Sequence, residues 1–348
     1  MATIWFWLVA FMLTTYVALD GFDIGVGILH LIITRSDDEK RLTLRTIGPV
    51  WDGNEVWLIA GGGTLFFAFP LVYATSFSGF YLPLMIVLWL LILRGVSIEL
   101  RSHLNLRVWR SFFDGLFCFA SVVLAIFFGA ALANVIRGVP LSPGATFFLP
   151  LWTNWRVSPN PGILDWYTVI GGVLSLVALS VHGTLYLAVK TGGILQMRAR
   201  AILRYLWTPL VVLTTISLIA TMNIHPHSLH NYTAHPIAFI IPFGVVLSLA
   251  GMFHFSRKQR DGRAFASSTI YLILMMFGAA FGLYPALLPS ITNSALDLTI
   301  YNASSGPYAL HVGLIWWGLG MLLALGYFST VYWMFRGKVD LNSEGYGH

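Results

Sequence analysis

Long apolar stretches restrict what this chain can fold into more than any other feature of its sequence. A helix crosses the apolar part of a bilayer with about 20 mostly apolar residues. Reading the chain with that window gives nine candidate membrane spans. They lie near residues 4–33, 51–69, 79–100, 112–136, 164–190, 205–223, 236–256, 265–288 and 310–335.

Composition agrees with a membrane location. Charged residues make up only 10% of the chain and its mean hydropathy is +0.77, whereas soluble domains carry about 25% charged residues. We therefore predict an all-α integral membrane protein with one transmembrane domain over residues 1–348. A faint likeness between the first and fifth spans suggests two pseudo-repeat halves, 1–136 and 164–288, followed by a last helix at 310–335.

Basic residues are distributed very unevenly over the connections. Alternate connections hold 18 of the 20 Lys and Arg residues, and the others hold only Arg137 and Arg156. With nine alternating spans, all the basic segments fall on one side of the membrane. The positive-inside rule then predicts an external N-terminus and a cytoplasmic C-terminus. The net charge of +6 expresses this asymmetry, so we expect no nucleic-acid partner.

The histidines and the single cysteine are the candidate ligands for a metal or haem. One cysteine, Cys118, excludes a multi-cysteine metal site. Four histidines in one external loop have no carboxylate or thiol beside them, and we expect solvated imidazoles and no metal site there. These are His225, His227, His230 and His235. Haem would need embedded ligands on facing helices, and His182 is well embedded whereas His30, His254 and His311 fall near span ends.

The longest external connection, residues 137–162, is rich in Pro, Gly and Trp. Such composition is typical of irregular structure. We predict a lid across the external end of the bundle and no further span there.

Two pairs of acids in the first two spans carry the strongest functional signal. Asp20 and Asp23 are three residues apart, and Asp52 and Glu55 repeat that spacing, so each pair shares one side of a helix. Because the first span runs inward and the second runs back, both pairs lie toward the cytoplasmic half. Asp23 is placed near mid-bilayer and Asp52 is shallower, which predicts a ladder of acids.

Two interpretations of these acids stay open at this point. Carboxyl groups that are buried and crowded are expected to hold protons near neutral pH, which a proton relay needs, and intramembrane ionisable groups often mark ion or proton pathways. Alternatively, the acids cap helix ends or pair with Arg35, Arg45 or Arg94 as polar contacts between helices. Nearby glycines, including Gly21 and Gly25, predict close helix contact.

Four segments resemble a known family. They are "ALDGFDIGVGIL", "IGPVWDGNEVWLIAGGGTLFFAFPLVYA", "SGFYLPLMIVLWLLILRGVSIELR" and "LYPALLPSI…LTIYNASSGPYALHV". They are similar, in order along the chain, to subunit II of the cytochrome bd family of quinol:oxygen oxidoreductases. The resemblance implies nine transmembrane helices arranged as two four-helix bundles plus one peripheral helix.

The resemblance also implies a role within a complex. The family's haem-bearing subunit I holds two b-type haems and a haem d, or a third b-type haem, and oxidises quinol on the outer side. Subunit II holds none of them and has no catalytic residue; it stabilises subunit I and contributes to a cytoplasmic proton path for reduction of O₂ to water. Membrane potential arises without proton pumping, because protons are taken up inside and released outside.

Matching the motifs assigns Asp23 and Asp52 to acidic positions associated with that path. Trp51 belongs to the same block, Glu55 falls where some members carry Gln, and Asp20 and Arg94 match family positions. A structural quinone, present in some members, is a candidate ligand, and small single-helix accessory subunits are candidate partners alongside subunit I and membrane lipid. The implied location is the bacterial or archaeal cytoplasmic membrane.

Two other functions compete with the oxidase subunit. A proton-coupled secondary transporter would account for internal repeats, although substrate-binding broken helices are not evident. A purely structural membrane anchor would leave the acids inert. Transport predicts activity without a haem partner, and the anchor predicts that the acids can be neutralised freely.

Overall fold

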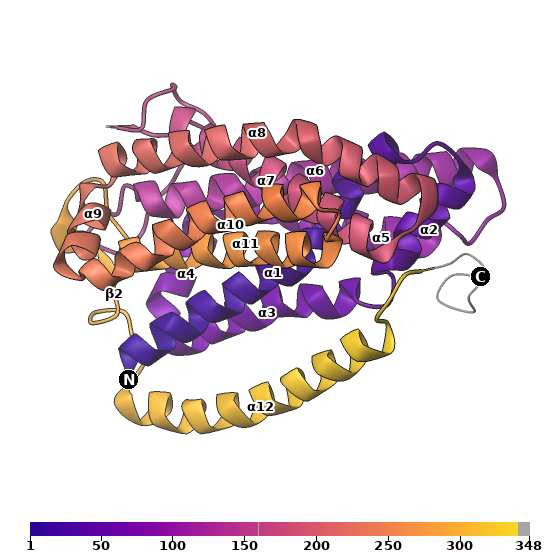
Figure 1. Cartoon of the computed structure of the whole chain (residues 1–348). Coiled ribbons are helices and arrows are strands. Elements are labelled where there is room, and N and C mark those ends of the chain that lie inside the picture. The colour runs from indigo at the N-terminus through magenta and orange to yellow at the C-terminus, as the bar shows by residue number, and fades with distance from the viewer. Residues whose placement is uncertain (159, 340–348) are drawn as a thin grey trace.

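The computed structural model describes residues 1–158 and 160–339, apart from the side chains of 226–228, as an elongated bundle of helices (Figure 1). Small irregular elements lie between the helices at one end. In chain order the elements are α1 (Ala2–Ile33), α2 (Asp37–Ile47), α3 (Trp51–Ala68), α4 (Pro70–Gly79), α5 (Tyr81–Leu100), α6 (Arg107–Arg137), α7 (Trp166–Lys190), α8 (Gly193–Ile224), α9 (Pro226–Ala234), η1 (Pro236–Phe239), α10 (Ile240–Arg257), α11 (Asp261–Leu283), β1 (Ala286–Leu288), η2 (Ser294–Leu296), β2 (Leu298–Thr299) and α12 (Pro307–Met334).

In this described part, eight helices are long and apolar enough to cross a membrane. They are α1, α5, α6, α7, α8, η1 with α10, α11 and α12, and they correspond to eight of the nine predicted spans. The ninth prediction, 51–69, coincides with α3, whose 18 residues begin with Asp52, Asn54 and Glu55. These polar residues lower the mean hydropathy of α3. That α3 crosses the membrane therefore stays a prediction.

Three predicted boundaries were wrong. Helix α6 begins at Arg107, five residues before the predicted residue 112. Helix α8 begins at Gly193, well before the predicted residue 205, because its first turns are helical but too polar for an apolar window. Helix α11 ends at Leu283 and not at residue 288. Pro285 follows two residues later, and a proline disfavours helical backbone in the residue before it, here Tyr284. Residues 286–288 instead form β1, which pairs antiparallel with β2.

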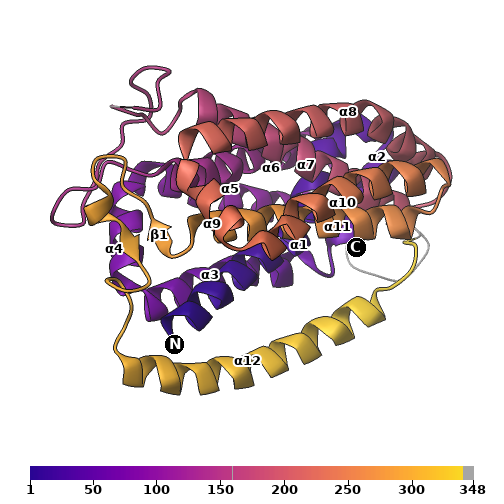
Figure 2. The same cartoon turned by 60° about the vertical axis from the view of Figure 1, so that its left-hand side comes forward.

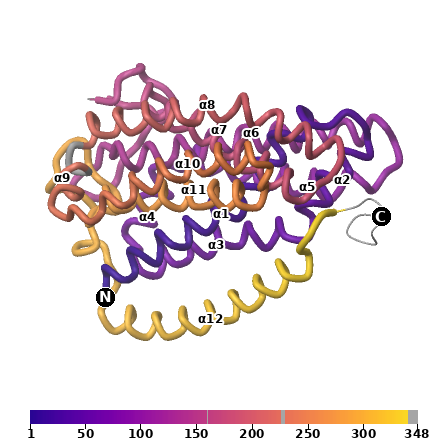
Figure 3. The backbone as a smooth tube through the Cα atoms, viewed as in Figure 1, coloured from indigo at the N-terminus to yellow at the C-terminus, as the bar shows by residue number. Residues whose placement is uncertain are grey.

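The helices run back and forth along the bundle, so the connections gather at two ends (Figures 2 and 3). Helix α2 and the connections α5–α6, α7–α8 and α10–α11 lie at one end, which we call the basic end. Helices α4 and α9 and the strands lie at the opposite end. The predicted segregation of basic residues to one end of the molecule is thereby confirmed.

Helix α1 forms the centre of the bundle and lies against α3, α6, α7 and α11. Glycines allow this close packing, as predicted. A Cβ at Gly25 would lie 2.7 Å from the backbone nitrogen of Gly183 in α7, and one at Gly27 would lie 2.6 Å from the Cβ of Ser121 in α6. The glycines of α3 differ, since a Cβ at Gly62 or at Gly63 would meet nothing within 4 Å. Those two do not bring a neighbouring helix close.

Helix α12 lies apart from the other helices along much of its length (Figures 1 and 2). Only 6% of its apolar window is buried within the chain. Near its start, the Leu310 carbonyl accepts a hydrogen bond from the Trp5 indole N–H at 3.1 Å. Near its end, Phe328 stacks at an angle against Trp57 of α3, with ring centroids 5.3 Å apart. Division of the remaining helices into two four-helix bundles stays a prediction, as do the pseudo-repeat halves.

The long connection between α6 and α7 is irregular in its described residues, as predicted. Leu141, Leu149 and Ile163 from this segment share an apolar cluster with Trp5 of α1 and Leu310 of α12. Val139 also bridges to Ser290 beside the strands. The segment thus closes the apolar core at the end opposite the basic end.

Candidate functional site

Arg94 of α5 lies at the centre of a buried cluster of ionisable groups. Its guanidinium donates to both carboxylate oxygens of Asp20, at 3.0 and 2.6 Å, and to Glu55 Oε1 at 2.5 Å. Arg94 and Asp20 are each 0% exposed, and Glu55 is 21% exposed. Three helices, α1, α3 and α5, are therefore joined at one point inside the bundle. Charge-assisted bonds in a dry site of this kind are among the strongest polar contacts that proteins make.

Asp23 lies one helical turn further along α1 and is 0% exposed. Its Oδ2 accepts a hydrogen bond from the side-chain amide of Asn54 at 2.7 Å. Its Oδ1 has no hydrogen-bond partner among the residues that the structure describes. Asn54, also 0% exposed, accepts a hydrogen bond from the Tyr332 hydroxyl at 2.9 Å. Asp23 is therefore held by a neutral amide and has no salt-bridge partner in the described chain.

The cluster contains more carboxyl groups than cations. Asp20, Asp23 and Glu55 lie around one guanidinium, that of Arg94. A buried charge without a counter-charge is expensive to maintain, so three ionised carboxylates beside one cation are disfavoured. An arrangement of this kind can hold and pass on protons, which a cluster with balanced charges does less readily.

Asp52 lies away from the buried cluster. It occupies the exposed side of the first turn of α3, at the basic end. Trp51 is buried instead, and its ring lies 3.2 Å from where a Cβ on Gly95 would stand. Trp51 thus packs α3 against α5 next to Arg94. Of the predicted site residues, Arg94 is in direct contact with Asp20 and with Glu55. Asp23 lies next to them on α1, and Trp51 packs beside them. Asp52 faces outward.

A second buried cluster surrounds Asp114 of α6 near the basic end, and the sequence analysis missed it. Asp114, 2% exposed, accepts hydrogen bonds from Arg101 Nε at 2.5 Å and from Lys40 Nζ at 3.1 Å. His30 Nε2 lies 2.8 Å from Asp114 Oδ1, and Arg101 also reaches Asp37 at 2.7 Å. The signal was present, since Asp114 interrupts the apolar run "FFDGLF". An acid inside a membrane span should be treated as a candidate site by default.

Asn54 and Tyr332 were also missed, for different reasons. Asn54 lies inside the "WDGNE" block, but only Trp51 and the acids of that block were predicted as site residues. Tyr332 is 278 residues from Asn54, and the sequence carries no signal that joins them. Only the three-dimensional arrangement of α3 and α12 brings the two side chains together.

A buried histidine can bind haem iron only through a ring nitrogen that has no other partner. His182 Nδ1 lies 2.8 Å from the Ser268 hydroxyl and Nε2 lies 3.0 Å from the Ala18 carbonyl. His30 has Thr43 at 3.0 Å on its other nitrogen. Both nitrogens of each ring are therefore engaged. Among the described residues, no group of three or more His, Cys, Asp or Glu side chains is placed to hold a metal ion. The side chain of His227 is not among the described residues.

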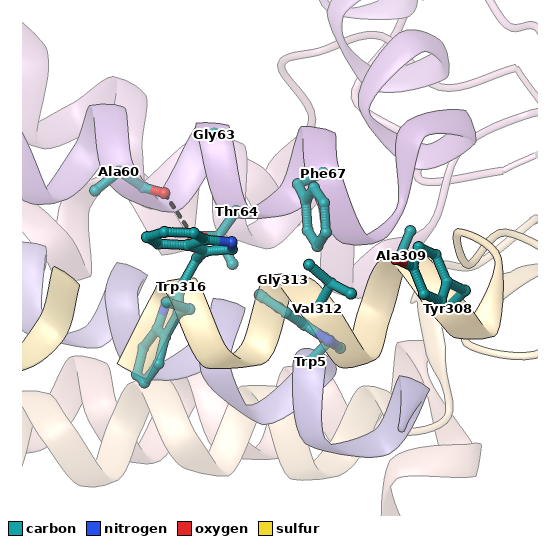
Figure 4. Close-up of a pocket in the computed structure, with 11 residues that line it drawn as sticks. Trp5, Ala60, Gly63, Thr64, Phe67, Tyr308, Ala309, Val312, Gly313 and Trp316 are labelled. Carbon is teal, nitrogen blue, oxygen red and sulfur yellow. Dashed lines mark hydrogen bonds between the residues drawn. The ribbon is translucent and has the colours of Figure 1, made fainter. Parts of the chain in front are cut away.

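Two cavities are distinct from the carboxyl cluster. A cavity of 1340 Å³ with mostly apolar walls runs between α1, α6, α7, α8, α10 and α11. Tyr16 is one of the residues that line it, although its hydroxyl lies beside Asp20 of the carboxyl cluster. A smaller crevice of 510 Å³ lies between α3 and α12 (Figure 4). Its lining includes Trp5, Phe67 and Trp316, and its Thr64 hydroxyl already donates to the Ala60 carbonyl.

These observations define the class of the protein: a multi-span helical membrane protein that keeps carboxyl groups buried in its first helices. The model of one family, cytochrome bd terminal oxidase subunit II, matches residues 1–335. Cytochrome bd ubiquinol oxidase subunit 2 from Bacillus subtilis (strain 168) is 32% identical, and the match covers 97% of this chain and 96% of that protein. Cytochrome bd-I ubiquinol oxidase subunit 2 from Escherichia coli (strain K12) is 31% identical, with 97% and 94% covered.

The chain belongs to the family of subunit II of cytochrome bd terminal oxidases. It is therefore a bacterial membrane protein and a subunit of an oxidoreductase complex of the respiratory chain. A solved structure, that of bd oxidase from Geobacillus thermodenitrificans, has the same fold, with a TM-score of 0.69 and 19% identity over 96% of this chain and 98% of that one. The resemblance seen in the sequence motifs is thus confirmed.

Proposed function

We propose that this chain, as the non-haem subunit II of a quinol:O₂ oxidoreductase, stabilises the haem-bearing subunit I and supplies carboxyl groups to a cytoplasmic proton path. The observation that carries the proposal is the group of three buried or half-buried carboxyl groups around one guanidinium. Reduction of O₂ to water consumes protons, and a path through low-dielectric protein needs groups that can take up and release them.

The exposure of the four acids supports a direction for the path. Asp52 is exposed at the start of α3, Glu55 is 21% exposed one turn further, and Asp20 and Asp23 are 0% exposed. A proton would enter at Asp52 and pass Glu55 to reach the carboxyl groups of α1. Asp23 is the best carrier, because its Oδ1 has no partner within the described chain and its other oxygen accepts from a neutral amide.

The proposed orientation puts the N-terminus outside and the C-terminus in the cytoplasm. It is supported by the gathering of the basic connections at the end of the bundle where α3 begins. Cytoplasmic connections carry an excess of Lys and Arg in bacterial membrane proteins. With this orientation Asp52 is near the cytoplasmic surface, as a proton entry requires. Proton uptake there, with release by quinol outside, would generate membrane potential without pumping.

Asp20 and Glu55 have a further role in the proposal. Their bonds to Arg94 favour the alternative considered from the sequence, in which acids hold helices together. We assign them to both functions: they join α1, α3 and α5, and their negative charge favours protons near Asp23. A purely structural anchor would need only the contacts that join the helices. The Asp23 oxygen that has no partner within the described chain argues against a purely structural anchor. Membership of the oxidase family favours this proposal over a secondary transporter.

The test uses the purified oxidase complex with Asp23→Asn and Asp52→Asn, each compared with Glu99→Gln, a control for an exposed carboxyl outside the cluster. Quinol-driven O₂ consumption and generation of membrane potential are measured after the haem spectrum and subunit content have been matched to wild type. We expect turnover to fall at least tenfold in Asp23→Asn and severalfold in Asp52→Asn. Unchanged turnover and potential in both variants would leave the anchor as the better account.

A structural quinone is a second candidate function, favoured by the cavity of 1340 Å³. Its walls are apolar enough for an isoprenoid tail, and Tyr16, one of the residues that line it, is a buried aromatic side chain against which such a tail would pack. Extraction of the delipidated complex should yield one quinone beyond that of the catalytic site. Extracts with no such quinone would contradict this assignment. The same preparation also serves to identify the quinone type, the accessory subunits and the haem complement of the complex.

A further inference from the structure

We propose that Asn54 and Tyr332 act as a positioning pair that orients the Asp23 carboxyl for proton transfer, so that the last helix of the chain takes part in the path. The proposal rests on the proton path argued above. It concerns two neutral side chains to which the sequence analysis assigned no role, although Asn54 lies inside the "WDGNE" block. Neither is required to carry a proton itself.

The pair forms one continuous line of hydrogen bonds from α12 through α3 to α1. The Tyr332 hydroxyl donates to Asn54 Oδ1 at 2.9 Å, and Asn54 Nδ2 donates to Asp23 Oδ2 at 2.7 Å. A longer contact of 3.4 Å joins the same Nδ2 to the Leu19 carbonyl. Both Asn54 and Asp23 are 0% exposed, so bulk water does not compete for these groups.

The two ends of the Asn54 amide differ chemically, and this difference gives Tyr332 its role. An amide has a carbonyl oxygen that accepts and an NH₂ group that donates. As long as the Tyr332 hydroxyl holds the carbonyl oxygen, the NH₂ group faces Asp23 and favours its carboxylate. Without that hydroxyl, the carbonyl oxygen is buried and unsatisfied. The amide can then rotate and turn its oxygen toward Asp23, which disfavours release of the proton.

Helix α12 reaches the cluster only through its last turns. Most of the helix stands away from the bundle, yet Phe328 packs on Trp57 and lies 3.6 Å from where a Cβ on Gly53 would stand. This contact places Tyr332, one turn further, over Asn54. Tyr327, on the same helix, is 57% exposed, so its side chain lies outside this line of hydrogen bonds. Tyr327 is therefore a matched control.

The experiment compares Tyr332→Phe with Tyr327→Phe in the intact oxidase complex. Loss of one positioning hydrogen bond should lower kcat for O₂ reduction three- to tenfold, with the KM for quinol unchanged and the solvent deuterium isotope effect increased. Haem spectrum and subunit content of the complex should stay at wild-type values. Tyr327→Phe should change none of these. Equal turnover and isotope effects in the two variants would overturn the proposal.

A double-mutant cycle tests whether Tyr332 acts through Asn54 and Asp23. Tyr332→Phe should have no further effect in an Asn54→Ala or an Asp23→Asn background. Additive losses would show that Tyr332 acts elsewhere and would overturn the pair. The cycle also separates the two proposals. If turnover collapses in Asp23→Asn but is unchanged in Tyr332→Phe, only the positioning pair is refuted. If turnover is unchanged in Asp23→Asn, the proton path itself is refuted.

Discussion

The Arg94 guanidinium and the Asp20 carboxylate form a two-pronged salt bridge, at 3.0 and 2.6 Å, between helices whose residues are 74 positions apart in sequence. Both side chains are completely buried. Two parallel N–H···O bonds match the fork of a guanidinium to the two oxygens of a carboxylate. The pair therefore fixes the rotation of α1 relative to α5 as well as their contact.

Arg94→Met is expected to destabilise the complex by about 3–5 kcal/mol, because it leaves Asp20 buried and without its counter-charge. Arg94→Lys should recover only part of this loss, since an ammonium cannot form the paired bonds. Thermal unfolding of the complex and retention of both subunits after purification give the measurement. A fully stable Arg94→Met variant would mean that the pair contributes little.

The Asp114 cluster predicts a separate stability effect near the basic end. Asp114→Asn leaves Arg101 and Lys40 without their shared carboxylate, so it should destabilise the complex by about 2–4 kcal/mol. Glu99→Gln, which alters an exposed carboxyl at the end of α5, should change stability by less than about 0.5 kcal/mol. Proton-coupled turnover per intact complex should stay at wild-type level in both. A loss of turnover in a stable Asp114→Asn complex would add Asp114 to the proton path.

Much of the fold could be predicted from apolar runs, because a bilayer forces every spanning backbone to satisfy its hydrogen bonds within a helix. That is why α1, α5 and α7 match their predicted ranges within two residues of their ends. The same method lost accuracy at the starts of α6 and α8, where polar residues are helical. Hydropathy measures burial in lipid and does not measure helicity.

The site was predictable only in part. Spacing and motifs indicated Asp20, Asp23 and Glu55, and also Arg94 as a partner for acids, which the structure joins to Asp20 and Glu55. They could not indicate that Asp52 points outward. Hydrogen bonds between distant helices depend on helix rotation and tilt, which a single sequence does not specify. Tyr332 is the clearest example, since its role follows only from where the last turns of α12 lie.

The contact between α1 and α7 predicts a sharp difference between two glycine substitutions. Gly25→Ala would push a methyl group against the Gly183 backbone, 2.7 Å from its nitrogen, and should destabilise by about 1–3 kcal/mol through overpacking. Gly62→Ala meets nothing within 4 Å and should leave stability unchanged or raise it by up to about 1 kcal/mol, because alanine favours helices. Thermal unfolding of the two variant complexes is compared. Equal stability would show that α1 and α7 are less closely packed than described.

Glu39 of α2 predicts how stability near the basic end depends on pH. Burial raises the pKa of its carboxyl, but hydrogen bonds from the backbone N–H of Arg35 and from Arg198 outweigh burial and hold the pKa below its usual range. A carboxyl whose pKa is depressed by folding adds stability above its unfolded pKa, and that stability is lost as the pH falls through the folded value.

Glu39→Gln should therefore lower the thermal stability of the complex near neutral pH by about 0.5–1.5 kcal/mol, since it removes the charge that Arg198 contacts and weakens the capping box with Ser36. The difference from wild type should shrink as the pH is lowered below about 4, where the unfolded chain binds a proton and the folded one begins to do so. Asp38→Asn, one residue earlier and exposed, is the control. A difference between Glu39→Gln and wild type that is constant from neutral to acid pH would mean that the Glu39 charge does not stabilise α2.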